Sequence, residues 1–140
     1  MGAGIMFMTR DGEVLALRRN DYKGDRWSGH WDFPGGSSEQ GESRYETAIR
    51  ESFEETGNPT HFKVVDHFKN GNHYTLFLAL VPKAFKPILS EEHSSWAWFK
   101  PLELLEKKMH PKDKKPLLIY LSRSGKHFAT PPKPYSPPKG

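Results

Sequence analysis

Residues 36–58 read GSSEQGESRYETAIRESFEETGN and contain the signals of one helix over residues 43–56. Ser43 and Glu46 stand in the S-x-x-E order of a capping box, which satisfies free backbone donors at a helix start. Gly57 supplies a stop at the other end. Apolar or small side chains then recur at the spacing of a buried helical stripe; these are Tyr45, Ala48, Ile49, Ser52 and Phe53.

The opposite face of the predicted helix collects Arg50, Glu51, Glu54 and Glu55. Spacings of three and four residues place the three carboxylates within about one helical turn, where like charges repel by a few tenths of a kcal/mol per pair. Such a face is either a solvated charged surface or a site that a hard divalent cation neutralises, with phosphate oxygens and waters as its other ligands. The Gly35-Gly36 turn before the helix favours the cation, because glycine lets backbone approach it closely.

Strand-like runs surround the helix. Residues 5–9 and 14–18 form one predicted hairpin, joined at Asp11-Gly12, and residues 61–69 and 72–81 form another, joined at Asn70-Gly71. The Asn-Gly dipeptide favours a tight primed turn. A short strand over 95–99 and helices over 101–108 and 111–123 complete the pattern, each helix beginning at a proline. Strands mixed with helices predict an α/β fold with a mixed sheet.

Length and composition narrow the class of protein. A chain of 140 residues without cysteine fits one domain with a modest core, and it has neither disulfides nor thiolate zinc ligands. No apolar run approaches the roughly 20 residues of a membrane span, and we expect a cytoplasmic protein with no membrane partner. We divide the chain into a domain over 1–123 and a Pro/Lys-rich tail over 124–140, which is expected to be extended or disordered.

The net charge of +4 is unevenly distributed. Residues 39–55 carry six glutamates and two arginines, a local charge of −4, so the remaining residues carry +8. This division suggests an anionic partner held near a bound cation.

Seven residues of the segment stand at a spacing that resembles the Nudix box: Gly36, Glu42, Arg50, Glu51, Glu54, Glu55 and Gly57. The chain is similar to small, MutT-like members of the Nudix hydrolase family over roughly residues 3–123. The resemblance implies an α/β/α sandwich and metal-dependent hydrolysis of a pyrophosphate in a nucleoside diphosphate linked to another group. Ser52 and Asn58 depart from the box, which expects bulky aliphatic residues there.

By the same resemblance, Glu51, Glu54 and Glu55 would bind Mg²⁺ or Mn²⁺ together with the Gly35 carbonyl. Arg50 would orient the carboxylates, chiefly Glu51. Glu42 would act behind the metal ligands or at the helix start. Family members draw the general base from the box helix or from a later loop, so the candidates here are Glu51 first and Glu92 second.

Substrate-binding residues are predicted before and after the box. Arg18 and Arg19 point to opposite faces of one strand, and we favour Arg19 for phosphate, with structural ion pairing as its alternative. Trp31 and Tyr74 are candidates for stacking on a base, against a role in the core or its rim. Tyr74 lies sixteen residues past Asn58, where similar enzymes acting on dinucleoside polyphosphates carry Tyr.

The expected substrates are a (d)NTP, oxidised ones included, or a dinucleoside polyphosphate. ADP-ribose or another nucleotide sugar is the alternative. A different class of function is a nucleotide-sensing or RNA-binding module without catalysis. A lysine run motivates RNA, including capped or 5′-triphosphate RNA, although we favour a solvated helix junction as its explanation; the run comprises Lys107, Lys108, Lys112, Lys114 and Lys115.

Overall fold

The computed structural model describes residues 1–59 and 61–124. The elements are β1 (Gly2–Met8), β2 (Val14–Arg19), β3 (Trp31–Asp32), β4 (Gly35–Ser37), α1 (Arg44–Thr56), β5 (Lys63–Asn70), β6 (Tyr74–Leu80), β7 (His93–Phe99), α2 (Pro101–Leu105) and α3 (Pro111–Ser124). The predicted α/β class is therefore confirmed. The tail predicted over 124–140 lies outside the described residues, apart from Ser124 at the end of α3.

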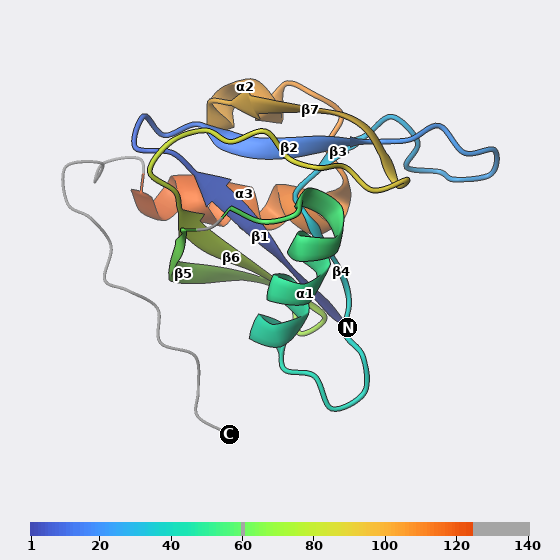
Figure 1. Ribbon diagram of the computed structural model, residues 1–140, viewed down its shortest axis with the longest axis horizontal. Coiled ribbons are helices and arrows are strands. Elements are labelled where there is room, and N and C mark those ends of the chain that lie inside the picture. Colours follow the sequence, from blue (N-terminus) through green and yellow to red (C-terminus); the bar gives the residue numbers. More distant parts are fainter. Residues whose placement is uncertain (60, 125–140) are drawn as a thin grey trace.

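A mixed sheet forms the middle of the molecule, as predicted (Figure 1). Strands β1 and β6 are parallel neighbours along the whole of β1, and β5 continues the sheet antiparallel to β6. On its other side, β1 pairs with β4 near its start and with β2 near its end. Strand β2 also pairs with β3 and β7. Because β4 pairs with β1, the turn before α1 is held against the central strand.

Helices cover both faces of this sheet, which gives the expected α/β/α layers (Figure 1). Alternate side chains of a strand point to opposite faces. Ile5 and Phe7 of β1 therefore belong to the core cluster that contains Ala48 of α1. Met6 belongs to the second cluster, which contains Leu117 of α3. Among the described residues, no helix is long and apolar enough to span a membrane.

Both predicted ends of α1 are confirmed. The Glu46 amide donates to Ser43 Oγ at 3.1 Å and the Ser43 amide donates to Glu46 Oε1 at 3.0 Å, which completes the capping box. Gly57 adopts a left-handed conformation with φ 77° and donates to the Phe53 carbonyl. These local hydrogen bonds fix where the helix begins and ends.

The predicted buried stripe of α1 is confirmed at Ala48 and Ser52, which are buried, and at Tyr45 and Ile49, which pack against the same core. It differs at the last position. Phe53 is 62% exposed, whereas Glu55 is only 3% exposed. Polar partners on the turn before the helix explain the difference. The Gly35 amide donates to Glu55 Oε1 at 2.7 Å, and the Thr47 hydroxyl donates to Ser38 Oγ. The helix therefore directs a mixed polar face inward.

The second hairpin also corrects a prediction. Asn70 pairs with Tyr74 across a loop of three residues, and Gly71 has φ 61°. A two-residue type I′ turn needs positive φ at both central residues. Asn70 does not have it, because Asn58 is the one non-glycine residue with positive φ in the described part of the chain. The Asn70 side-chain amide donates to the carbonyls of Pro111 and Lys112, which holds Asn70 in the strand beside α3.

Candidate metal centre

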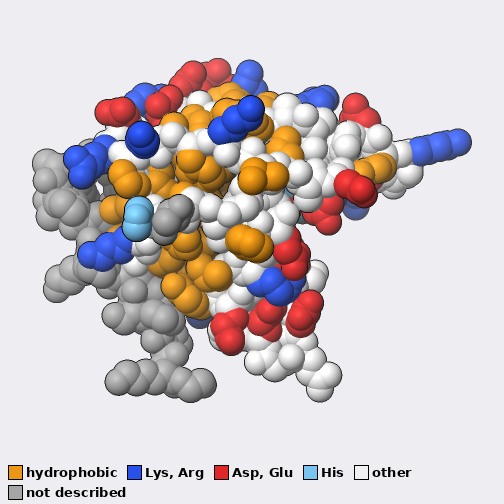
Figure 2. Space-filling view, in the orientation of Figure 1, with side chains coloured by type: hydrophobic (Ala, Val, Ile, Leu, Met, Phe, Trp, Pro, Cys, Tyr) orange, Lys and Arg blue, Asp and Glu red, His pale blue; other side chains and the backbone are white. Residues whose placement is uncertain are grey.

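Arg50 holds three carboxylates beside α1. Its Nε lies 2.7 Å from Glu42 Oε2, and its Nη1 lies 3.0 Å from Glu51 Oε1 and 3.2 Å from Glu54 Oε1. Its Nη2 also donates to the Ser37 carbonyl at 3.0 Å. We call Arg50, Glu42, Glu51 and Glu54 the Arg50 cluster. Acidic side chains gather around a basic one over α1 in the space-filling view (Figure 2).

The carboxylates of this cluster differ in how well they are compensated. Hydrogen bonds from Arg50, then from the Glu39 amide, lower the pKa of Glu42 to about 2. In contrast, the pKa of Glu51 is raised, first by burial and then by the nearby carboxylate of Glu54, which outweigh Arg50. Glu42 is thus a fully ionised anchor for Arg50, while Glu51 lacks part of its counter-charge.

Two glycines in the turn before α1 allow a close approach to their neighbours. A Cβ atom on Gly36 would overlap the carboxylate of Glu51, and one on Gly35 would overlap the hydroxyl of Tyr74. The Gly35 amide also donates to Glu55 Oε1. A side chain at Gly35 would also meet the backbone of Ala3 and Gly4 in β1, and one at Gly36 would push the Glu51 carboxylate aside, so close approach explains the glycine pair.

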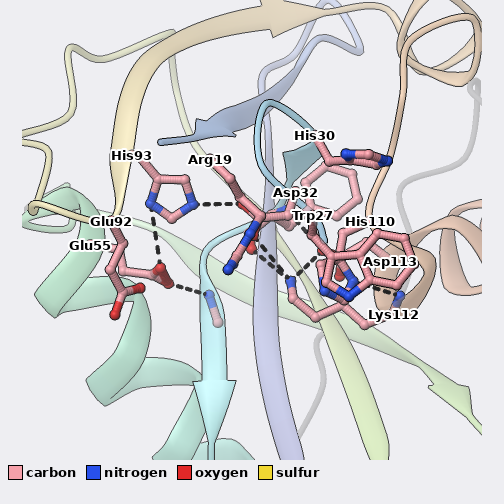
Figure 3. Close-up of polar contacts among 12 residues, drawn as sticks. Arg19, Trp27, His30, Asp32, Glu55, Glu92, His93, His110, Lys112 and Asp113 are labelled. Carbon is pink, nitrogen blue, oxygen red and sulfur yellow. Dashed lines mark hydrogen bonds and ion pairs between the residues drawn. The ribbon is translucent and has the colours of Figure 1, made fainter. Parts of the chain in front are cut away.

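A second group of charges lies inside the molecule (Figure 3). His93 lies between two carboxylates: its Nε2 is 2.8 Å from Asp32 Oδ1 and its Nδ1 is 3.6 Å from Glu55 Oε2. Lys112 Nζ lies 2.5 Å from Asp113 Oδ2 and 3.7 Å from Asp32 Oδ2. We call Glu55, His93, Asp32, Lys112 and Asp113 the buried network.

The buried network has two electrostatic ends. Burial raises the pKa of Glu55 to about 9, and the negative charge of Asp32 adds to this effect. Burial alone would also raise the pKa of Asp32, but Lys112, His93 and Arg19 lower it instead. Positive side chains of the protein therefore balance the charge of Asp32. No positive side chain in the described part of the chain balances a charge on Glu55 to the same degree.

Glu92 completes the group beside Glu55. One ligand atom each from Glu55, Glu92 and His93 lie within 4.8 Å of one another, and the Glu92 side chain is exposed. The negative charge of Glu92 contributes to the raised pKa of Glu51 and of Glu55. The structure thus brings the second candidate base next to the carboxylates of α1.

Arg19 forms ion pairs within the protein. Its Nη2 lies 3.1 Å from Asp25 Oδ2, and its Nη1 lies 3.5 Å from Asp32 Oδ2. Structural ion pairing was the alternative to phosphate binding for this residue, and it is the contact that the structure gives. The guanidinium remains beside the buried network, with about a quarter of its side chain exposed.

The two predicted stacking residues belong to the core or its rim. Tyr74 is 6% exposed, and the Lys112 ammonium lies 5.2 Å from its ring centroid. A base therefore has no free face of Tyr74 to stack on in this structure, and its hydroxyl instead packs under Gly35. Trp31 contacts Phe99 edge to face at 5.0 Å between ring centroids.

The sequence-based prediction missed His93, Asp32, Lys112 and Asp113 as site residues. Asp113 accepts from the Phe33 amide at 2.9 Å, so α3 is fastened to the segment just before the glycine turn. Lys112 was assigned to an exposed lysine run, yet it forms ion pairs inside the molecule. The available sequence signal for this network was Asp113, the lone carboxylate inside that lysine run. Nothing in the local pattern connected it with the other three residues.

The donors present fit a divalent cation. Carboxylate oxygens are supplied by Glu51, Glu54, Glu55 and Glu92, and oxygen ligands are those that Mg²⁺ prefers. Glu55 is buried without a sufficient cation, and the Nδ1 atom of buried His93 has no hydrogen-bond partner. A bound cation would satisfy both groups.

Comparison with known proteins gives the family. The NUDIX domain model matches residues 1–120. The RNA pyrophosphohydrolase of Roseobacter denitrificans is 35% identical over 94 residues, which is 66% of this chain and 56% of that protein. A second RNA pyrophosphohydrolase, from Shewanella piezotolerans, is 30% identical over 94 residues, 66% of this chain and 51% of its own. The chain thus spans about half the length of these relatives.

Solved structures agree on the fold. An Ap4A hydrolase of C. elegans superposes with a TM-score of 0.70 at 20% identity, covering 89% of this chain and 98% of its own. A MutT protein from Methanosarcina mazei Go1 superposes with a TM-score of 0.64 at 24% identity, covering 89% and 94%. With the box residues gathered beside α1 and the family model matching most of the chain, this protein belongs to the NUDIX domain family.

Proposed function

We propose that this chain is a divalent-cation-dependent pyrophosphohydrolase, in which water attacks phosphorus in a nucleoside diphosphate linked to another group. The observation that carries the proposal is the position of the box carboxylates: Arg50 holds Glu51 and Glu54, and Glu55 lies with Glu92 and His93 in a group whose donor atoms are within 4.8 Å of one another. The family match and the relatives named as pyrophosphohydrolases support a hydrolase acting on phosphorus-containing anhydrides.

The residues divide the work between holding charge and positioning. Glu51, Glu54 and Glu55, with the Gly35 carbonyl, would hold Mg²⁺ or Mn²⁺. The cation, when bound, neutralises phosphate charge and lowers the pKa of a coordinated water. Arg50 would keep the Glu51 carboxylate in place, through the 3.0 Å contact between them. Glu51 is the preferred general base, because members of the family draw the base from the box helix or from a later loop. Glu92 is the second candidate.

We propose a nucleoside 5′-polyphosphate as the substrate, either a free (d)NTP or a dinucleoside polyphosphate. The structural neighbours named Ap4A hydrolase and MutT protein support this class. A triphosphate at the 5′ end of RNA is the second candidate, favoured by relatives named RNA pyrophosphohydrolase. Exposed lysines beside α2 and in α3 suit a longer phosphate chain; they are Lys107, Lys108, Lys114 and Lys115.

A panel of phosphohydrolase assays with Mg²⁺ or Mn²⁺ tests the proposal. The panel comprises dGTP, oxidised dGTP, diadenosine tetraphosphate, ADP-ribose and RNA with a cap or a 5′-triphosphate, and chromatography resolves the products. We expect cation-dependent cleavage of at least one polyphosphate substrate. Nucleotide binding without cleavage of any substrate would instead support a sensing module.

A further inference from the structure

We propose that His93 is a metal ligand, whose Nδ1 atom joins Glu55 and Glu92 in a mixed nitrogen and oxygen site that prefers Mn²⁺ to Mg²⁺. The proposal rests on the cation site of the proposed function and adds a ligand to it that lies outside the α1 helix. Its evidence is the orientation of a buried imidazole, the hydrogen bonds of its neighbours and the spacing of three donors.

The imidazole of His93 is fixed in one orientation by Asp32. The His93 side chain is 0% exposed, and its Nε2 lies 2.8 Å from Asp32 Oδ1. Its other nitrogen, Nδ1, has no hydrogen-bond partner and points toward Glu55 Oε2 at 3.6 Å (Figure 3). Buried polar atoms are nearly always satisfied, so an unpaired nitrogen directed at a carboxylate indicates a partner that both atoms share.

The neighbours of Asp32 determine which nitrogen carries the proton. Lys112 and Arg19 approach the Asp32 carboxylate to 3.7 and 3.5 Å and hold it in its ionised form, which can only accept hydrogen bonds. The Nε2 atom must then be the donor, which leaves the lone pair of a neutral imidazole on Nδ1. A carboxylate that accepts from one nitrogen while the other binds a metal is the usual arrangement around a histidine ligand.

Glu55 presents one oxygen to the same point. Its Oε1 accepts from the Gly35 amide at 2.7 Å, which leaves Oε2 facing His93. With Glu92, the three donor atoms lie within 4.8 Å of one another. A cation with bonds of about 2.1 Å holds neighbouring ligands about 3.0 Å apart and opposite ones about 4.2 Å apart, so the exposed Glu92 has to move inward to close the site.

The chemistry of these donors selects the cation. Two carboxylates and one imidazole form a mixed set, whereas Mg²⁺ strongly prefers oxygen ligands and retains waters. An alternative is a doubly protonated His93 that bridges Asp32 and Glu55. The distance of 3.6 Å from Nδ1 to Glu55 is longer than an ion-paired hydrogen bond, which disfavours that bridge.

Electron spin-echo envelope modulation (ESEEM) spectroscopy of the Mn²⁺-loaded full chain tests the assignment without any turnover. We expect ¹⁴N coupling from a directly bound imidazole, replaced by ¹⁵N coupling when histidine is labelled with ¹⁵N. His93→Gln, whose amide can still donate to Asp32, should abolish the coupling. It should weaken Mn²⁺ binding by about tenfold or more and Mg²⁺ binding by about threefold or less. His61→Gln, at an exposed histidine away from the site, is the matched control and should retain the coupling.

Bound Mn²⁺ without nitrogen coupling in the wild-type chain, or coupling that persists in folded His93→Gln, would overturn the proposal. If His93→Gln does not fold, the labelled wild-type chain alone decides. If the chain shows nitrogen coupling but cleaves no nucleotide, the proposed function is rejected and the assignment of His93 as a metal ligand stands. If the chain cleaves a nucleotide in a cation-dependent way but shows no nitrogen coupling, the proposed function stands and the assignment of His93 is rejected.

Discussion

The Arg50 cluster and the buried network each contain three carboxylates, but they are stabilised in opposite ways. In the Arg50 cluster, one arginine pairs with all three carboxylates, Glu42, Glu51 and Glu54. All four residues lie in α1 or the loop just before it. In the buried network, Lys112 and His93 pair with carboxylates contributed by β3, α1 and α3. One group is local and partly exposed, and the other joins distant elements inside the protein.

This difference separates function from stability. Partly exposed charges are screened by water, so the Arg50 cluster can lose one carboxylate at small cost to folding. Buried charges that lose a partner remain unpaired in a medium of low dielectric constant, so the buried network should tolerate little change. Glu55 belongs to the buried network and also stands beside the Arg50 cluster on α1, which places the candidate cation between the two regions.

The largest expected effect is on the stability of the buried network. Asp113→Asn removes the partner that Lys112 approaches to 2.5 Å and weakens the acceptor of the Phe33 amide. We expect a loss of about 3–5 kcal/mol in the free energy of unfolding, because the Lys112 charge loses its nearer partner and keeps only the Asp32 carboxylate at 3.7 Å. Urea denaturation measures it. Lys114→Ala, at an exposed lysine of α3, is the control, and a loss below about 1 kcal/mol for Asp113→Asn would contradict the predicted dependence on this pair.

The second effect is on turnover and concerns the Arg50 cluster. Glu54→Gln should lower cation-dependent turnover about 100-fold or more, equivalent to roughly 2.7 kcal/mol. The free energy of unfolding should change by less than about 1 kcal/mol, because Glu54 is about half exposed. Both are measured at saturating Mg²⁺ on the substrate that the panel identifies. Glu39→Gln, at an exposed glutamate 3.8 Å from Arg50, should stay near wild type. Near-wild-type turnover of Glu54→Gln would reject Glu54 as a metal ligand.

The third effect concerns pH. The pKa of Glu42 is lowered from 4.5 to about 2 in the folded protein, chiefly by Arg50. A lowered folded-state pKa contributes stability that is complete above the unfolded value and is lost as the pH falls through the folded value. Metal-free wild-type protein should therefore lose this contribution between about pH 4.5 and 2. Urea midpoints across that range should fall less steeply for Glu42→Gln. Equal slopes for the two proteins would contradict the Arg50–Glu42 contact.

The smallest expected effect is on the stability of α1, at a residue of its exposed face. Phe53 is 62% exposed, so Phe53→Ala should change the free energy of unfolding by about 0.5 kcal/mol or less. A loss of about 3 kcal/mol, the usual cost for a buried Phe, would show that Phe53 is buried in solution, as the predicted stripe had it. Thermal unfolding of the two proteins side by side resolves this difference.

The same contrast explains how much could be predicted from the sequence. Helical spacing is a local rule, so the ends of α1 and the proximity of Arg50, Glu51 and Glu54 followed directly from it. The inward position of Glu55 did not follow, because it depends on the amide of Gly35 twenty residues earlier.

Longer-range contacts were beyond local patterns altogether. The hydrogen bond between Asp32 and His93 spans 61 residues, and the one from Phe33 to Asp113 spans 80. The turn after Asn70 was also misjudged, because α3 supplies the carbonyls that hold the Asn70 side chain. Tertiary contacts therefore determined each feature that the sequence-based prediction missed.

Hydrolysis in water enriched in ¹⁸O tests the central claim most directly. A substrate cleaved in the panel is incubated with the chain and Mg²⁺, and ³¹P NMR locates the heavy oxygen in the products. Attack of water on phosphorus predicts ¹⁸O bonded to phosphorus in one product, with no cleavage when the cation is chelated. Cleavage that persists without a divalent cation, or products free of ¹⁸O on phosphorus, would contradict the account.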